Sequence, residues 1–569
     1  MKYILSFFLL VPRFLFAQQF AEPSYPKDYF RAPLDIPILL AGNVGEIRPG
    51  HFHAGLDMKT NGHIGMPVHA AADGYISRVA VSSTGYGNVI YITHPAGYTT
   101  LYGHLHRFNP QLEKYVEEKQ YQQESWSVDL RIPPGLFPVK KGQFIAWSGS
   151  TGSSEAPHVH FEIRNTETGH ALNGLLFGFD IKDNIAPAVY RIAVYDRSKS
   201  IYEQAPTIYA VHKVNGEYVP LSPDIVTKAG KVGFGVSALD HENGTSNIYG
   251  VYEEILYDNN RPNIGFRLDD IGNDETRYVN AHVDYKTRQQ KGFTFQLLFS
   301  LPGNDLPVYH DFNGNGAVDL SDGQPHEIKI LVKDPYGNTS TVRFHIRRSA
   351  AAEAAKEDSC VNRMYPGAKD IFENSHVQFY LDEQALYDDI CFQYQRIPTQ
   401  AAGYYSDVYR LHTPAVPLHD YFHLFIKPDR DIPNNLHDKL VIVRTAPGGG
   451  GRSAAPATWS DGWLEGDFRD FGDFSIQADD KAPVITPVGL HAGIDLSKAT
   501  TMSFRLSDNL SGIKDYRAEL DGKWLMFAQK GNTIYYTFDD HCPRGQHKLS
   551  LTVHDAAGNQ ATYLLNFKR

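Results

Sequence analysis

Two short motifs each occur twice in the chain, and they constrain its fold more than any other feature. Asp-Asn-Ile-Ala-Pro at 183–187 matches Asp-Asp-Lys-Ala-Pro at 479–483. Asp-Pro-Tyr-Gly-Asn at 334–338 matches Asp-Ala-Ala-Gly-Asn at 555–559, and strand-forming residues flank both copies. The second motif predicts a hairpin turn in which glycine supplies the positive φ angle. A chain that repeats such elements is predicted to contain repeated β modules.

Length and composition agree with a modular β protein. At 569 residues, a typical domain size of about 150 residues gives three to five domains. Aromatic residues make up 12% of the chain, and glycine and proline are abundant, at 48 and 33 residues, which favours strands and turns. We predict a mainly β fold, with an antiparallel-sheet domain followed by β-sandwich, immunoglobulin-like domains. The expected boundaries are a signal peptide at 1–17, a first domain at 18–185, an immunoglobulin-like domain at 186–348, a linker and central β domain at 349–480, and a C-terminal immunoglobulin-like domain at 481–569.

The N-terminus resembles a secretory signal peptide. Lys2 precedes an apolar run, and the small residue Ala17 ends the segment. No later stretch reaches the ~18 apolar residues that a membrane span requires. Removal of the segment takes away Lys2 and Arg13 and moves the net charge from -11 to -13. No clustered basic face is visible, so we expect an exported, soluble chain that does not bind nucleic acid.

Cysteine usage and two biased segments give further expectations. The three cysteines are widely spaced, so at most one disulfide can form, and we expect it between Cys360 and Cys391 in an exported chain. Residues 347–359 predict a linker, and the glycine run within 446–457 predicts a flexible loop.

Gly-His-Phe-His-Ala-Gly-Leu-Asp at 50–57 brings His51, His53 and Asp57 close together. Imidazole nitrogen and carboxylate oxygen suit a borderline divalent cation such as zinc. The chain has 25 histidines, so such a cluster also arises by chance. Local spacing permits either histidine as a ligand.

The segment Pro-His-Val-His-Phe-Glu-Ile-Arg at 157–164 has the alternation of a half-buried strand. His158 and His160 are expected on one face, and Val159 and Phe161 on the core face. The two imidazoles would lie roughly 7 Å apart. By the same alternation, His104 and His106 in Tyr-Thr-Thr-Leu-Tyr-Gly-His-Leu-His (98–106) would share a face with Tyr102. Spacing alone does not say which of the two approaches the site.

These segments supply the groups that metal-assisted hydrolysis requires. A catalytic zinc keeps three protein ligands and an open position for water. A base must accept a proton, and a donor must stabilise the oxyanion. Histidines and an aspartate on predicted strands and loops could serve as the ligands, the base and the donor. The chain has no His-Glu-x-x-His helix that would supply a different zinc site.

The ordered set His-Ala-Gly-Leu-Asp (53–57), Tyr-Gly-His-Leu (102–105), Gly-Ser-Thr-Gly (149–152) and Pro-His-Val-His-Phe (157–161) resembles the lysostaphin/LytM-type zinc endopeptidases of bacterial cell walls. The resemblance covers roughly residues 40–180. It implies that His53, Asp57 and His160 bind Zn²⁺, that His158 acts as general base, and that His104 stabilises the developing oxyanion.

All five positions are occupied, so the resemblance implies an active metalloprotease. The expected function is a secreted zinc endopeptidase that hydrolyses peptide stems or cross-links of peptidoglycan. It would be periplasmic or associated with the cell envelope, and its immunoglobulin-like modules would contact envelope proteins. The alternative is a non-catalytic scaffold that binds the wall or activates another hydrolase.

The segment 107–138 is longer than in the family. It begins with a helix capped by Asn109, with Pro110 in its first turn, which could line or block the substrate groove.

A second metal site is predicted downstream. Asp311, Asn313, Asn315, Asp319 and Asp322 follow the oxygen-ligand spacing of a calcium loop, with Gly316 at the sixth position. The arrangement resembles the loop of dockerin modules and gives the expectation of Ca²⁺, with an ordinary polar hairpin as the alternative.

Overall fold

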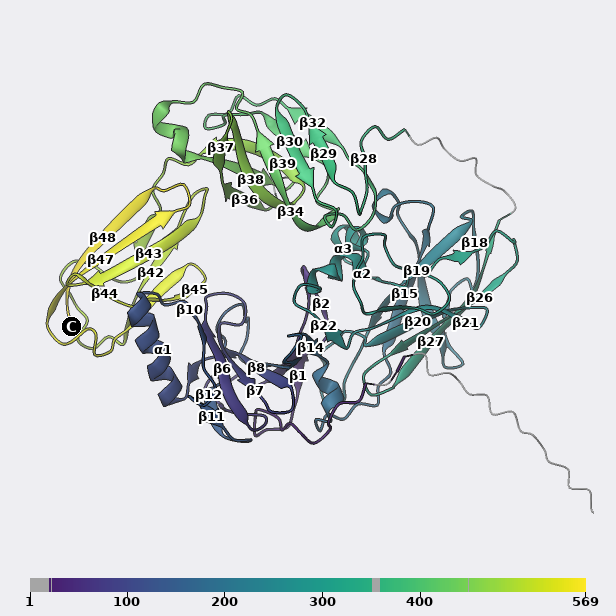
Figure 1. Cartoon of the computed structure of the whole chain (residues 1–569), viewed down its shortest axis with the longest axis horizontal. Coiled ribbons are helices and arrows are strands. Elements are labelled where there is room, and N and C mark those ends of the chain that lie inside the picture. The colour runs from purple at the N-terminus through teal and green to yellow at the C-terminus, as the bar shows by residue number, and fades with distance from the viewer. Residues whose placement is uncertain (1–19, 22, 350–358, 449) are drawn as a thin grey trace, which may run out of the picture.

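The computed structural model describes residues 20–21, 23–349, 359–448 and 450–569. It is mainly β, as predicted, and its strands form four successive groups along the chain (Figure 1). The predicted signal peptide at 1–17 lies outside the described residues. Within the described part, no helix combines the length and apolar character needed to cross a membrane.

The first module is built on an antiparallel sheet in the order β1-β4-β13-β8-β7-β6-β10. A small sheet, β5-β12-β9, packs beside it. The strands are β1 (Leu40–Gly42), β4 (Leu56–Lys59), β13 (His158–Asn165), β8 (Tyr98–Leu105), β7 (Asn88–Thr93), β6 (Gly74–Val81), β10 (Val128–Arg131), β5 (Pro67–His69), β12 (Phe144–Trp147) and β9 (Arg107–Phe108), with β11 (Pro138–Val139), β14 (Ala171–Leu172) and the hairpin β2 (Ile47–Arg48) and β3 (His51–Phe52) at the margins.

Alternation on β13 fixes which of its side chains enter the core of this module. Val159, Phe161 and Ile163 are fully buried and join one apolar cluster with residues of β4, β6, β7 and β8. The predicted apolar face of this strand is confirmed. Because side chains alternate, His158 and His160 project from the opposite face.

The insertion at 107–138 begins with helix α1 (Pro110–Gln123), as predicted. The side chain of Asn109 caps it by accepting a hydrogen bond from the backbone N–H of Leu112 at 3.1 Å. Leu112 and Val116 are buried against the first module. The rest of α1 stays available for contacts with other parts of the chain.

The second module contains a large sheet in the order β23-β19-β15-β16-β17-β27-β26-β20-β21-β24. Strand β22 (Asp270–Ile271), which lies within the sequence of the second module, pairs with β14 of the first module and so joins the two modules. The elements are β15 (Ala188–Asp196), β16 (Thr207–Val214), β17 (Glu217–Pro220), β18 (Asp224–Thr227), β19 (Lys231–Leu239), β20 (Glu253–Asp258), β21 (Arg261–Arg267), α2 (Val279–His282), α3 (Tyr285–Lys291), β23 (Gln296–Leu297), β24 (Tyr309–Asp311), β25 (Val318–Asp319), β26 (His326–Lys333) and β27 (Thr339–Arg348).

The third module has two five-stranded sheets, whose buried residues form one cluster with those of the second module. The predicted disulfide between Cys360 and Cys391 is present. The predicted flexible loop at 446–457 is partly wrong, because Arg452–Pro456 forms strand β36 and pairs with β35. The strands are β29 (Asp370–Glu373), β30 (Val377–Leu381), β34 (Pro417–Ile426), β38 (Trp463–Asp470) and β37 (Thr458–Ser460) in one sheet, and β32 (Tyr394–Ile397), β33 (Val408–Leu411), β39 (Gly472–Ala478), β35 (Leu440–Thr445) and β36 in the other.

The C-terminal module has a four-stranded and a five-stranded sheet that share one apolar core. The two Asp-x-x-Gly-Asn motifs form the hairpin turns that their sequence predicts, between β26 and β27 and between β47 and β48. Gly337 and Gly558 have φ angles of 89° and 75° in these turns. The strands are β40 (Val484–Pro487), β42 (Thr501–Ser507), β46 (Thr533–Thr537) and β45 (Ala528–Lys530) in one sheet, and β41 (Ile494–Asp495), β48 (Gln560–Lys568), β47 (Gln546–Asp555), β43 (Ile513–Leu520) and β44 (Lys523–Trp524) in the other.

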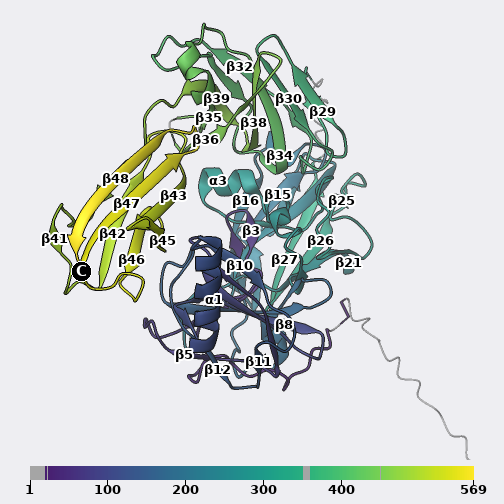
Figure 2. The same cartoon turned by 60° about the vertical axis from the view of Figure 1, so that its left-hand side comes forward.

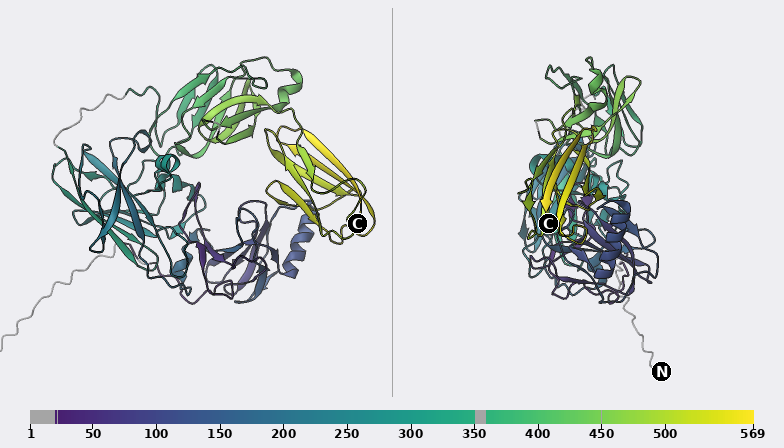
Figure 3. Two further views of the ribbon diagram at one scale, coloured as in Figure 1. Left: turned by 180° about the vertical axis from the view of Figure 1, so that it is seen from behind. Right: turned by 90° about the vertical axis from the view of Figure 1, so that its left-hand side faces the viewer.

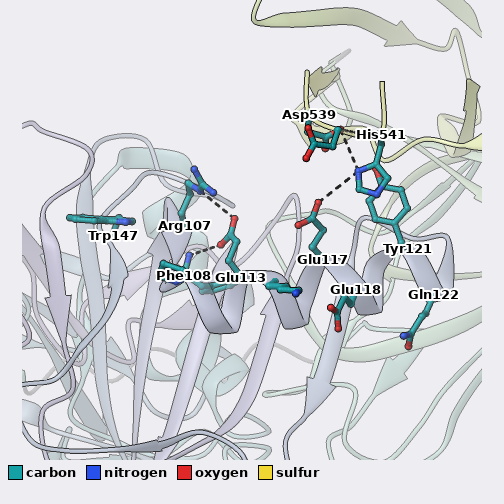
Figure 4. A pocket seen from close by; sticks show the side chains of 13 residues that line it. Arg107, Phe108, Glu113, Glu117, Glu118, Tyr121, Gln122, Trp147, Asp539 and His541 are labelled. Carbon is teal, nitrogen blue, oxygen red and sulfur yellow. Dashed lines mark hydrogen bonds and ion pairs between the residues drawn. The ribbon is translucent and has the colours of Figure 1, made fainter. Parts of the chain in front are cut away.

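The four modules follow one another around a ring, and the last returns to the first (Figures 1 and 3). Figure 2 also shows α1 beside the C-terminal module. The ring of Tyr121 on α1 stacks on His541 with centroids 3.9 Å apart (Figure 4). Arg517 forms an ion pair with Glu124 at 2.7 Å. The insertion helix is therefore part of the contact between the C-terminal module and the first module.

Candidate metal centre

Adjacent strands of the first sheet bring three predicted ligands together. Asp57 on β4 pairs in register with His160 on β13, and His53 lies four residues before Asp57. One ligand atom from each residue lies within 4.8 Å of the other two. Oδ1 of Asp57 lies 3.1 Å from Nε2 of His53 and 2.9 Å from Nδ1 of His160, and the two nitrogens are 3.1 Å apart.

Hydrogen bonds on the far side of each imidazole fix its tautomer. Nδ1 of His53 donates to the carbonyl oxygen of Asn43 at 2.7 Å, because a carbonyl can only accept. Nε2 of His160 donates to the Glu162 carboxylate at 2.7 Å. The other nitrogen of each neutral ring then carries a lone pair. Two imidazole lone pairs and one carboxylate oxygen therefore converge on one point.

Glu162 is the residue that sequence reasoning missed at this site. Its side chain is buried, and it accepts hydrogen bonds from Arg164 at 2.5 Å and Tyr86 at 2.7 Å as well as from His160. Although burial raises the pKa of the Glu162 carboxyl, Arg164 and His160 lower it to about 2. A charged carboxylate behind a histidine ligand is the arrangement that orients many metal-binding histidines. Alternation along the predicted strand places Glu162 on the same face as His160, and this pattern could have identified Glu162 from the sequence.

Asp57 is held at both of its oxygens. Its Oδ2 accepts a hydrogen bond from Arg48 at 2.7 Å, and Arg48 also contacts Glu46 at 3.3 Å. Burial raises the pKa of Asp57, but the nearby imidazoles of His53, His158 and His160 hold it far below its usual range. This carboxylate is therefore ionised and fixed in position.

The electrostatics of the two histidines differ because their partners differ. Burial lowers the pKa of His53 to about 4, despite the nearby Asp57. Burial also lowers the pKa of His160, but hydrogen bonds from its ring to Asp57 and Glu162 raise it to about 9. A bound cation would therefore compete with a proton for Nδ1 of His160.

His158 and His104 lie beside the three ligands. Nε2 of His158 is 3.3 Å from Oδ1 of Asp57, and its Nδ1 donates to the carbonyl of Ala156 at 2.8 Å. The ring of His104 is 4.8 Å from that of His158 and 5.8 Å from that of His160, between centroids. Its Nδ1 donates to the carbonyl of Thr151 at 2.9 Å, which belongs to the Gly-Ser-Thr-Gly segment. All five sequence-predicted residues are thus brought together.

The structure corrects the simple alternation expected for residues 98–106. Tyr102 faces the core beside Phe161, as their paired positions require. Strict alternation would place His104 on that same face. His104 instead has a φ angle of +58°, a left-handed conformation that is uncommon outside glycine. This change of direction turns its ring toward His158 and His160.

The two histidines left open by spacing lie outside the site. His51 is exposed, and its Nδ1 lies 3.0 Å from the carbonyl of Pro49. His106 is also exposed, and its backbone N–H donates to the carbonyl of Trp147. Neither belongs to the cluster of ligand atoms.

The donor set fits zinc. Two neutral imidazoles and one carboxylate are a common set of three protein ligands in catalytic zinc sites, which leave a further position for water. The converging lone pairs would repel one another without a cation or a proton between them. Hydrogen bonds to Asn43 and Glu162 already point the free nitrogens at the shared position.

The calcium site predicted at 311–322 is not supported. Its ends pair with different strands, since β24 pairs with β21 and β25 pairs with β19, so the segment does not wrap around a central ion. Asn313 donates to the carbonyl of Pro262, and Asp319 and Asp322 accept from nearby backbone N–H groups. The ordinary polar connection, the alternative expectation, describes the segment better.

Comparison with known proteins agrees with this geometry. Residues 51–121 match the model of Peptidase family M23, and residues 361–479 match the model of a Zu5-like domain. The chain therefore contains an M23 peptidase domain, and the resemblance to lysostaphin/LytM-type enzymes is confirmed.

Three relatives illustrate the extent of the match. An uncharacterized metalloprotease of Haemophilus influenzae is 34% identical over 131 residues, which are 23% of this chain and 21% of that protein. Lysostaphin of Staphylococcus simulans is 35% identical over 140 residues, 24% of this chain and 21% of that protein. Peptidoglycan DD-endopeptidase ShyC of Vibrio cholerae is 31% identical over 145 residues, 24% of this chain and 27% of that protein. The matched part thus spans about a fifth to a quarter of each relative.

Proposed function

We propose that the protein is a zinc-dependent endopeptidase that hydrolyses peptide bonds of bacterial peptidoglycan. The observation that carries the proposal is the convergence of three ligand atoms, from His53, Asp57 and His160, beside two further imidazoles. The relative named a peptidoglycan DD-endopeptidase supports the substrate class.

His53, Asp57 and His160 would hold the zinc ion. When bound, zinc supplies Lewis acidity toward a water molecule and toward the carbonyl of the peptide. The hydrogen bond from Nδ1 of His158 to Ala156 leaves a lone pair on Nε2, so His158 can accept the proton of the attacking water. The same residue can then return the proton to the leaving amine.

His104 would stabilise the negative charge that develops on the substrate carbonyl. Its Nδ1 hydrogen is held by Thr151, so donation from Nε2 requires a second proton on the ring. Burial, together with the neighbouring His160 and His158, lowers the pKa of His104 to about 3. An adjacent oxyanion has the opposite effect on the pKa, so as negative charge develops His104 would take up a proton from solvent at Nε2 and donate a hydrogen bond to the oxyanion.

The proposed substrate is a peptide cross-link that contains D-amino acids, and the proposed location is the periplasm or the cell envelope after export. The name of the Vibrio cholerae relative supports a DD-peptide bond. The modules after the peptidase domain would position the enzyme on its substrate or on envelope proteins. The proposed active face of the first sheet is the face that carries His158 and His160.

The test is cleavage of purified cross-linked muropeptides by the full-length protein, followed by mass spectrometry of the products. We expect cleavage that stops after chelation and returns with zinc. His158→Ala should abolish turnover and retain zinc, whereas His51→Ala should behave as the wild type. Binding of muropeptides without cleavage by a zinc-loaded protein would contradict the proposal and would favour the non-catalytic scaffold.

A further inference from the structure

The repeated motifs place two clusters of three aspartates at equivalent positions in two modules. We call Asp183, Asp240 and Asp334 the first aspartate cluster, and Asp479, Asp508 and Asp555 the second aspartate cluster. In each cluster, one carboxylate oxygen from every residue lies within 4.8 Å of the other two. None of the six carboxylates forms an ion pair with a basic side chain among the described residues.

The two clusters agree in their detailed construction. The first aspartate of each lies five residues before a strand that opens its module, β15 or β40. The second directly follows the end of a strand, β19 or β42. It is followed four residues later by a glycine, Gly244 or Gly512, with a φ angle of 83° in both cases. The third begins the Asp-x-x-Gly-Asn turn.

The asparagine of that turn occupies the same place in both modules. Asn338 donates from Nδ2 to Asp334 at 2.7 Å and to the carbonyl of Asp183 at 3.4 Å. Asn559 donates from Nδ2 to Asp555 at 2.8 Å and to the carbonyl of Asp479 at 2.8 Å. Each asparagine thus holds the third aspartate against the first. The same construction therefore occurs twice in one chain.

Each cluster also contains a buried oxygen that has no hydrogen-bond partner. Asp240 is only 2% exposed, and its Oδ1 is unpartnered. In the same cluster, Oδ2 of Asp183 is buried and unpartnered. In the second cluster, Oδ1 of Asp508 is buried and unpartnered. Leaving a buried carboxylate oxygen without a partner is costly, so a positively charged ligand would stabilise both of the repeated sites.

The chemistry of the donors narrows the ligand. All of the side-chain donors are carboxylate oxygens, without histidine or cysteine, which is the preference of hard cations such as Ca²⁺ and Mg²⁺. Burial, together with the like charge of Asp334, raises the pKa of Asp240 to about 8. We propose that the first and second aspartate clusters are two binding sites for hard divalent cations, separate from the zinc centre.

The first cluster is positioned to connect the second module to the peptidase domain. The segment that begins at Asp240 continues to Gly250 and lies against the first module. Tyr249 donates its hydroxyl to the carbonyl of Leu40, and Asn247 donates to the carbonyl of Ala41, both on β1. β1 pairs with β4, which carries Asp57. A cation in the first cluster would therefore fix a segment that supports the strands of the zinc centre.

The test uses the full-length, zinc-loaded protein. Isothermal titration with Ca²⁺, and separately with Mg²⁺, should show about two equivalents bound per chain. Ca²⁺ or Mg²⁺ should raise the temperature of thermal unfolding by about 5 °C. Asp240→Asn and Asp508→Asn should each remove one equivalent, and the double variant should remove both. Because asparagine resembles a neutral aspartic acid, these variants are expected to fold.

Asp480→Asn is the matched control, because it removes the same charge next to Asp479 from an exposed side chain. It should bind both equivalents. The proposal is overturned if neither Ca²⁺ nor Mg²⁺ binds to the zinc-loaded wild type. It is also overturned if the Asp240→Asn and Asp508→Asn variants bind as many equivalents as the Asp480→Asn control. Zinc content, measured in every sample, separates these results from failure of the proposed peptidase site.

Discussion

The candidate zinc centre and the two aspartate clusters each gather three ligand atoms within 4.8 Å of one another, but they do so with different chemistry. In the zinc centre, two of the three atoms are imidazole nitrogens, each fixed by a hydrogen bond behind it. In the clusters, all three are oxygens, and Asn338 or Asn559 holds the third aspartate against the first. The difference teaches that the metal preferred by each site is set by the type of donor and by the residues behind the donors.

Removal of a zinc ligand should give the largest effect. His160→Ala removes one of two nitrogen donors and leaves Asp57 without its closest imidazole. We expect a loss of activity on the order of a thousandfold and loss of the bound zinc, measured by muropeptide cleavage and by elemental analysis. His51→Ala is the control, because His51 is exposed and outside the cluster. A zinc-free His160→Ala protein with wild-type cleavage would refute the role of the centre.

Metal replacement tests whether the two kinds of site are independent. After complete chelation, zinc alone should restore cleavage, and Ca²⁺ alone should restore thermal stability without restoring cleavage. The expected shift in unfolding temperature is about 5 °C. Calorimetry and a cleavage assay on the same samples measure both. If zinc alone restored activity and stability in full, the aspartate clusters would have no separate role.

The carboxylate behind His160 should have an intermediate effect. Glu162→Gln keeps the shape of the side chain but weakens its hydrogen bond from Nε2 of His160. Changes of this kind usually lower metal affinity or activity about 10- to 100-fold. A competition assay with a zinc chelator measures the affinity. Glu167→Gln is the control, since Glu167 is exposed, and equal affinities of the two variants would contradict the assigned role.

The asparagine that positions the first aspartate cluster should have the smallest effect. Asn338→Ala removes hydrogen bonds to Asp334 and to the carbonyl of Asp183. We expect a loss of about 1 kcal/mol in the free energy of unfolding and weaker Ca²⁺ binding, with cleavage largely retained. Denaturant titration with and without Ca²⁺ measures the change. If the loss of stability is the same with and without Ca²⁺, Asn338 stabilises the turn but does not contribute to Ca²⁺ binding.

The sequence predicts the parts of both kinds of site that depend on local pattern. Alternation of residues 157–164 gives the face of His158 and His160, and the repeats predict the turns at Gly337 and Gly558. Asp240 and Asp508 were not predicted, because the segments around them share few letters beyond aspartate and glycine. The turn of His104 was also missed, because it depends on a positive φ angle that tertiary contacts select. Resemblance to a known family, rather than spacing, gave the preference for His53 over His51.

The return of the C-terminal module to α1 has a consequence for how firmly the ring is closed. Its contacts include exposed groups, such as Arg517 with Glu124 and Lys530 with the carbonyl of Ser150. Between separate molecules such contacts would be weak. Here covalent connection raises the effective concentration of one surface at the other. Ser150 is next to Thr151, which orients His104, so the closure of the ring lies beside the candidate metal centre.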